Sequence, residues 1–118
     1  MTNQSDLLML RDKLREFAEA RDWDQFHSPK NLSMALMVEV AELMEHFQWL
    51  TEEQSGNLDA AKKAVVAEEL ADILLYLVRL SDKLEVDLPE AARHKLEKNA
   101  VKYPAERVRG SSKKYSEY

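Results

Sequence analysis

The chain has no cysteine, which excludes disulfide bonds, thiolate nucleophiles and zinc sites built on cysteine. Only two glycines and three prolines occur among its 118 residues. A glycine-rich phosphate-binding loop and a dinucleotide-binding turn therefore lack the residues that form them, and a fold of many β-strands lacks its turn residues.

Basic charge and long apolar runs are also missing. The formal net charge is −5, which argues against a nucleic-acid-binding protein, because such a protein needs a basic stripe. Charged residues interrupt every apolar run, so no segment is expected to span a membrane. The first residues show no basic start followed by an apolar stretch, so no secretory signal is expected. We therefore expect a cytoplasmic protein without nucleic-acid or membrane partners.

What the chain does have is helical periodicity. Its length, with 45% hydrophobic and 33% charged residues, fits one ordered domain, expected over residues 1–104, followed by a polar, loosely held tail over residues 105–118. Apolar residues recur at helical spacing. The predicted helices are Asp6–Arg21, Ser28–Leu50, Leu58–Leu84 and Pro89–Tyr103, with Ser5 and Ser28 as N-caps and Thr51 with Gln54 as a capping box. Short connections predict antiparallel neighbours in an all-α, four-helix bundle-like fold.

Two acidic pairs interrupt the apolar pattern of the two longest predicted helices. Glu39 and Glu42 form the first pair, and Glu69 and Asp72 form the second. A spacing of i, i+3 places both carboxylates of a pair on one helix face. If these two helices lie side by side in opposite directions, the pairs meet at some level of the bundle.

Four carboxylates favour Mg²⁺, with Mn²⁺ as a substitute, over zinc or copper, and Mg²⁺ commonly accompanies phosphate chemistry. Either pair alone is more simply interpreted as a solvated helix face. Their recurrence on consecutive helices, each pair bordering an apolar stripe, gives a metal site equal weight with a solvated face. Converging carboxylates without metal repel one another, so at least one pKa is expected to rise.

Two further groups of residues fit a nucleotide ligand. The loop after the first helix holds Trp23, Phe26 and His27, and such loops either plug a core or line a pocket. Lys95 and Asn99 share a helix face with Lys102 and could clamp phosphates, although a solvated stripe is the simpler interpretation.

Several motifs together resemble one family, the MazG-like all-α nucleoside triphosphate pyrophosphohydrolases of the small dCTP pyrophosphatase type. The similar stretches are RDWDQFHSPKNL at 21–32, EVAELMEHFQW at 39–49, EELADILLYLVRL at 68–80, DLPEA at 87–91 and KLEKNAVKYP at 95–104. Together they cover most of the chain outside the first helix, residues 51–67 and the tail.

The resemblance implies Mg²⁺-dependent hydrolysis of a deoxynucleoside triphosphate, such as dCTP or a modified dCTP, to the monophosphate and pyrophosphate, as in control of nucleotide pools. It also implies assembly as a dimer or a dimer of dimers. The residues it implies as metal-binding and catalytic are Glu39, Glu42, Glu69 and Asp72. Those it implies as substrate-binding are Trp23, Asp24, Gln25, Phe26, His27, Trp49, Tyr76, Lys95 and Asn99. Animal members carry histidine in the first helix where this chain has Leu14, so the preferred base and sugar stay open.

Three hypotheses follow. The first is Mg²⁺-assisted attack of water on the α-phosphorus, with Glu39 or Glu42 orienting or deprotonating the water. The second is the same reaction on modified nucleotides or on a broad range of nucleoside triphosphates, because stacking discriminates bases poorly. The third is a non-enzymatic helical dimerisation module, which the long amphipathic helices alone would support.

Overall fold

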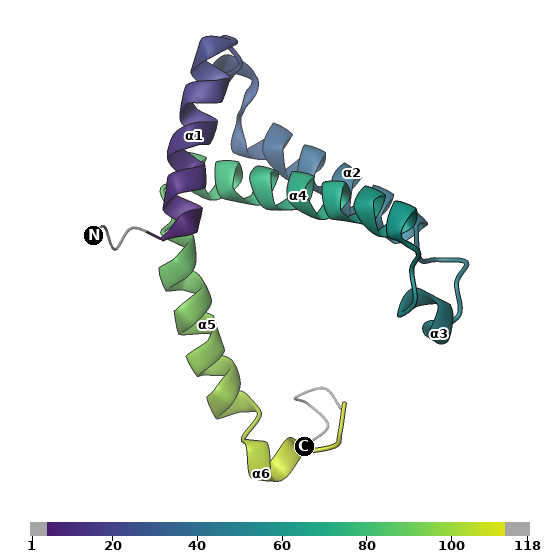
Figure 1. Ribbon diagram of the computed structural model, residues 1–118. Coiled ribbons are helices and arrows are strands. Elements are labelled where there is room, and N and C mark those ends of the chain that lie inside the picture. The colour runs from purple at the N-terminus through teal and green to yellow at the C-terminus, as the bar shows by residue number, and fades with distance from the viewer. Residues whose placement is uncertain (1–4, 113–118) are drawn as a thin grey trace. The chain divides into compact units, whose positions relative to one another are not determined.

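A computed structural model describes residues 5–112 and contains helices, turns and loops only over that range, which confirms the all-α prediction (Figure 1). The helices in chain order are α1 (Asp6–Ala20), the short 3-10 helix η1 (Asp24–Phe26), α2 (Pro29–Glu45), α3 (Glu52–Ser55), α4 (Ala60–Lys83), α5 (Leu88–Lys102) and α6 (Ala105–Val108).

Side-chain caps begin the helices where the sequence predicts them. The hydroxyls of Ser5 and Ser28 accept hydrogen bonds from the backbone three residues on, at Leu8 and Asn31. Thr51 and Gln54 form the expected reciprocal capping box at α3. Two further caps, Asp59 and Asp87, start α4 and α5. The predicted starts are therefore accurate to within two residues.

The end of α2 corrects a predicted boundary. The apolar pattern predicts a helix as far as Leu50, but α2 ends at Glu45. The amide groups of Phe47 and Leu50 donate to carbonyls three residues back, so tight turns replace the α-helix over residues 46–50. The physical reason is the next helix, because Thr51 can cap α3 only with extended backbone, and the chain must leave α2 before that point.

Helix α1 ends in a turn that contains no glycine. Asp22 adopts a positive φ of 54°, and the amide of Trp23 donates to the carbonyl of Ala18. These are the features of a Schellman motif, which usually places glycine at that position. The turn brings the ring of Trp23 edge-on to that of Phe17, with 5.7 Å between ring centroids. It thereby directs the loop that holds Trp23, Phe26 and His27, here called the aromatic loop, back onto α1.

Helices α2 and α4 lie side by side and run in opposite directions, as predicted, and α1 packs against α4 (Figure 1). The hydrophobic residues that are buried in the described part of the chain are Ala18, Leu32, Val66 and Val78. Other apolar residues of α2 and α4, among them Val40 and Leu70, are exposed. The helices therefore carry more apolar surface than they cover.

The chain divides into two compact units at the Val86–Asp87 peptide. The second unit contains α5 and α6, so the described part of the predicted tail includes one helical turn. The rest of that tail, residues 113–118, lies outside the described residues. In the described part of the chain, no helix combines the length and the apolar character needed to cross a membrane.

Candidate metal and nucleotide site

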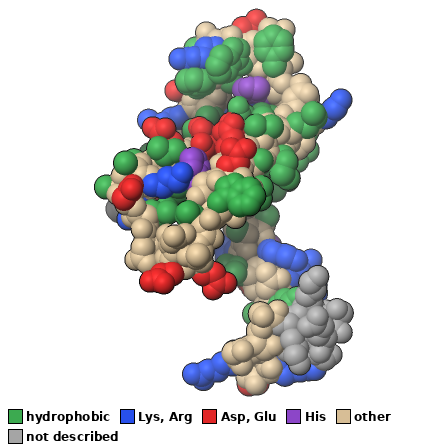
Figure 2. Space-filling model, turned by 90° about the vertical axis from the view of Figure 1, so that its right-hand side faces the viewer, with side chains coloured by type: hydrophobic (Ala, Val, Ile, Leu, Met, Phe, Trp, Pro, Cys, Tyr) green, Lys and Arg blue, Asp and Glu red, His purple; other side chains and the backbone are tan. Residues whose placement is uncertain are grey.

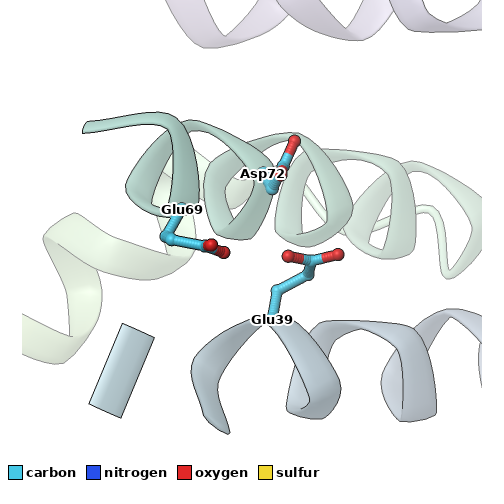
Figure 3. Close-up of side chains that lie close together, drawn as sticks. All are labelled: Glu39, Glu69 and Asp72. Carbon is cyan, nitrogen blue, oxygen red and sulfur yellow. The ribbon is translucent and has the colours of Figure 1, made fainter. Parts of the chain in front are cut away.

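Three of the four predicted acids converge between α2 and α4. Glu39 on α2 and Glu69 and Asp72 on α4 each offer a carboxylate oxygen, and these oxygens lie within 4.8 Å of one another. Figure 3 shows the Glu39 side chain rising from α2 toward the two acids on α4. Figure 2 shows acidic side chains gathered on one face of the molecule beside hydrophobic ones. The antiparallel pairing of the two helices thus brings together residues that are 30 or more positions apart in the sequence.

Electrostatics at this cluster favour a positively charged occupant. Burial, followed by the charges of Glu42 and Asp72, raises the pKa of Glu39 to about 7. The Oε2 atoms of Glu39 and Glu69 are buried and have no hydrogen-bond partner. Because buried carboxylate oxygens are normally hydrogen-bonded or bound to metal, these two oxygens fit a divalent cation. The rise in pKa expected from converging acids is found at Glu39.

Glu42 lies beside the cluster and is not one of the three converging acids. It is half-buried one turn after Glu39 on α2, and its charge contributes to the raised pKa of Glu39. It is therefore close enough to influence the site electrostatically, while its carboxylate is not part of the oxygen group itself.

His46 also lies at this site, although its residue type did not predict a role there. Its Nε2 atom lies 3.8 Å from Oε1 of Glu69, and both side chains are mostly buried. The signal was present in the spacing, because position 46 follows Glu39 and Glu42 at i+7 and i+4, on the same face of the helix.

Next to the acids is a mainly apolar cavity of about 230 Å³. Its lining comes from α1, the aromatic loop, α2 and α4. The lining residues are Leu14, Phe17, Ala18, Trp23, His27, Leu32, Asp72, Leu75, Tyr76 and Arg79. Asp72 therefore belongs both to the acidic cluster and to the cavity wall. The volume is below the usual range of roughly 300–1,000 Å³ for small-molecule pockets, so the cavity suits one ring better than a whole nucleotide.

The residues predicted to bind substrate fall into different places. Trp23, His27 and Tyr76 line the cavity. Gln25 instead donates to the backbone and side chain of Asp22, which secures the loop. Phe26 is 59% exposed and Trp49 is 86% exposed, and neither is among the residues that line this cavity.

Asp24 takes part in a charged network with α4. Its Oδ1 accepts hydrogen bonds of 2.6 Å from Nζ of Lys83 and from Nη2 of Arg79, and these contacts, that of Lys83 most, lower the pKa of Asp24. Arg15 on α1 donates to Asp82 on α4. The network lies in a second, open recess of about 460 Å³, lined by Arg15, Glu19, Asp24, Arg79, Asp82 and Lys83. With three cationic and three acidic side chains, this recess is close to neutral.

Lys95 and Asn99 lie on α5, in the second unit. The helix is formed as predicted, so the two residues are one turn apart on one face. Lys95 is exposed and Asn99 is half-buried. Their role at the phosphates stays a prediction.

Comparison with known proteins gives a consistent result. dCTP pyrophosphatase 1 of Homo sapiens is 48% identical over 104 residues, which is 86% of this chain and 61% of that protein. The Bos taurus protein of the same name is 47% identical over 104 residues, which is 86% of this chain and 62% of that protein. This chain therefore matches less than two thirds of the length of these relatives.

A solved structure, that of a pyrophosphatase from Archaeoglobus fulgidus DSM 4304, superposes with a TM-score of 0.81 at 41% identity. The match covers 88% of this chain and 97% of the other. Residues 34–118, which include both acidic pairs, match the MazG-like family along their length. The chain therefore belongs to the MazG-like family.

Proposed function

We propose that this protein hydrolyses a deoxynucleoside triphosphate between the α and β phosphates, releasing the monophosphate and pyrophosphate, with dCTP or a modified dCTP as its substrate. The observation that carries the proposal is the convergence of Glu39, Glu69 and Asp72 at the edge of an apolar cavity. The names of the similar proteins, dCTP pyrophosphatase 1 and a pyrophosphatase, point to the same reaction.

Glu39, Glu69 and Asp72 would hold Mg²⁺, with Mn²⁺ as a substitute. Hard carboxylate oxygens are the ligands that these ions prefer, and two of the oxygens are buried without a partner. When bound, the ion would supply positive charge for the phosphate oxygens of the substrate. The carboxylates themselves fix where that charge lies, because α2 and α4 hold them from both sides.

Glu42 is our choice for the residue that orients the attacking water. A general base must keep a carboxylate free to accept a proton, and Glu42 lies next to the three converging acids without being one of them. Attack of this water on the α-phosphorus would break the bond to the bridging oxygen, and pyrophosphate would leave.

The apolar cavity would receive the base. Trp23, Tyr76 and Phe17 provide aromatic surface, and Asp72 in the same wall connects the cavity to the metal ligands. In this arrangement the triphosphate lies toward the acids while the ring is removed from water. We extend the proposal to Lys95 and Asn99 as phosphate contacts on the basis of their residue types and shared helix face.

A broader substrate range is the second candidate, and one observation favours it. Most of the cavity lining is apolar, and aromatic stacking accepts every base. A panel of nucleoside triphosphates separates the candidates, because a dedicated dCTP enzyme prefers dCTP and its modified forms. Equal specificity constants for all bases would support the broad range instead.

We also propose that the protein works in the cytoplasm as a homo-oligomer. Many large apolar side chains on α2 and α4 are exposed, including Met34, Met37 and Leu70. Apolar patches of this kind on a soluble protein mark interaction surfaces, and a second copy of the chain offers the matching apolar face.

The proposed function is tested by pyrophosphate release from dCTP with Mg²⁺ and with a chelator. Metal sites supply several kcal/mol of transition-state stabilisation, so E39Q and D72N should each lower kcat/KM by roughly 100-fold or more. E45Q is the matched control, because Glu45 is an exposed acid on α2 outside the cluster. Near-normal turnover in E39Q, or products other than the monophosphate and pyrophosphate, would refute the assignment.

A further inference from the structure

Arg79 is a buried cation on α4 that contacts the aromatic loop at two points. It is 6% exposed. Its Nε atom donates to Nδ1 of His27 at 3.1 Å, and its Nη2 atom donates to Asp24 at 2.6 Å. Nη1 lies 3.5 Å from Oδ2 of Asp82. The two carboxylates balance the charge of the guanidinium and hold it in place.

The contact with Arg79 determines which nitrogen of His27 carries the proton. A guanidinium has only donors, so Nδ1 of His27 must be the acceptor and cannot carry a proton. A neutral imidazole that accepts at Nδ1 carries its single proton on Nε2. Burial, and then the charge of Arg79, lowers the pKa of His27, which agrees with an uncharged ring at neutral pH.

The Nε2–H group is available to a ligand. His27 lines the apolar cavity, and no described residue accepts a hydrogen bond from its Nε2 atom. A donor in a mainly apolar wall favours a ligand with an acceptor at that point, because a ligand that displaces water without accepting this hydrogen bond would leave the N–H group unpaired. Carbonyl oxygens and unprotonated ring nitrogens, as on the edge of a pyrimidine, have this chemistry.

We infer that Arg79 is a positioning residue that fixes His27 in the Nε2–H form, so that the cavity presents one directed hydrogen-bond donor to an acceptor atom of the substrate's base. The role of Arg79 and the tautomer do not depend on the proposed function, whereas the identification of the ligand as a nucleobase rests on it. Arg79 positions His27, and His27 provides the discriminating contact with the base.

The tautomer is tested on the full chain without ligand, by ¹⁵N NMR of the histidine side chains at neutral pH. We expect the wild-type His27 to show a protonated Nε2 and an unprotonated Nδ1. K83M is the matched control, because Lys83 shares Asp24 with Arg79 but makes no hydrogen bond to His27, so its His27 should keep the Nε2–H tautomer of the wild type. In R79M the His27 signals should shift toward a mixture of tautomers. A charged ring or an Nδ1–H form in the wild type would overturn the inference.

The effect on the substrate is tested with two replacements of His27, which avoids relying on R79M should that variant fold poorly. Asparagine places its amide near Nδ1 and can still accept from Arg79, but it offers the cavity no donor at the Nε2 position. Glutamine reaches the Nε2 position and can donate there. We expect H27N to raise KM for dCTP by about tenfold, with a smaller change in kcat, and H27Q to raise it less.

The two proposals fail in different ways. If the wild type releases no pyrophosphate from any nucleotide, the proposed function fails, and the NMR measurement still decides the tautomer. If the wild type is active and H27N has the same KM as the wild type, the inference about His27 fails and the proposed function stands. A substrate analogue that carries the triphosphate and sugar without a base should be turned over equally by wild type and H27N.

Discussion

At the scale of single residues, the carboxylate of Glu39 connects the site to the stability of the fold. Its pKa of about 7 lies above the ordinary value of 4.5 because the group is buried among other acids. The folded protein therefore binds this proton more tightly than the unfolded chain does. By linkage, the contribution of Glu39 makes the free energy of unfolding fall as pH rises from about 4.5 to about 7.

This predicts a pH-dependent effect of E39Q on the metal-free protein. Glutamine cannot ionise, so the variant should lose less stability than the wild type as pH rises across that window. Relief of about 1 kcal/mol of repulsion would place the Tm of E39Q about 4 °C above that of the wild type near pH 8 in a chelator. Circular dichroism melting curves at several pH values measure this, with E45Q as the control. A wild-type Tm that rises across the window in parallel with that of E39Q would contradict the assignment.

Added Mg²⁺ provides a second test of Glu39, because the cation binds its ionised form. A cation that binds only the folded, ionised site stabilises the fold by mass action, so Mg²⁺ should raise Tm more near pH 8 than near pH 5. E39Q should lose most of this effect. Sodium chloride of equal ionic strength is the control, and equal stabilisation by both salts would indicate a solvated acidic face rather than a metal site.

The residues of the site were predictable to different degrees from the sequence. The spacing of Glu39, Glu69 and Asp72 on two long amphipathic patterns was enough to predict that they meet. The hydrogen bond between Arg79 and His27 was not predicted, because the two residues are 52 positions apart and neither belongs to a repeating pattern. Contacts of this kind depend on the direction in which a loop leaves its helix, which sequence periodicity does not contain.

At the scale of elements, the helix starts were predicted well because side-chain caps mark them. The end of α2 was predicted poorly because tight turns follow it. Helix starts carry side-chain signals, and Ser5, Ser28 and Thr51 act as their types predict. The end of α2 was predicted five residues too late, because the apolar pattern continues through Phe47 and Leu50 after the helical hydrogen bonds have stopped. Periodicity reports which side chains face the core and is insensitive to a change from α-helix to tight turns.

The end of α4 provides a prediction at this scale. Glu85 has a φ of +56°, and the amide of Val86 donates to the carbonyl of Ser81, which makes a Schellman motif without glycine. A side chain in this left-handed region is strained, so E85G should raise the free energy of unfolding by about 0.5–1 kcal/mol.

The matched comparison is D22G at the end of α1, where the backbone conformation is the same. There the side chain of Asp22 accepts a hydrogen bond from Gln25, so glycine removes strain and a contact together. The gain in D22G should therefore be smaller than in E85G. Urea unfolding measures both, and a destabilised E85G would show that the motif at α4 depends on the Glu85 side chain.

At the scale of the whole molecule, the exposed apolar surface is the main unfavourable contribution to the stability of a single chain. Met37 is 64% exposed near the middle of α2, and several side chains on α4 are also exposed. Four buried hydrophobic residues among the described ones make a small core for a chain of this length. Burial of these faces between two copies would supply the missing apolar contacts, as in obligate dimers whose interfaces resemble a divided core.

This predicts that the wild type is a dimer or larger at micromolar concentration. M37E should lower both the molar mass of the assembly in solution and its Tm. The glutamate would place an unpaired charge within an apolar contact, which costs several kcal/mol or prevents association. A61E is the control, because Ala61 is exposed in the first turn of α4, where a glutamate is favourable. Light scattering coupled to size-exclusion chromatography measures the mass.

Because folding and association are linked in such assemblies, the Tm of the wild type should also rise with protein concentration. A wild type that stays monomeric, with a concentration-independent Tm, would show that these helices are stable with their apolar faces in water.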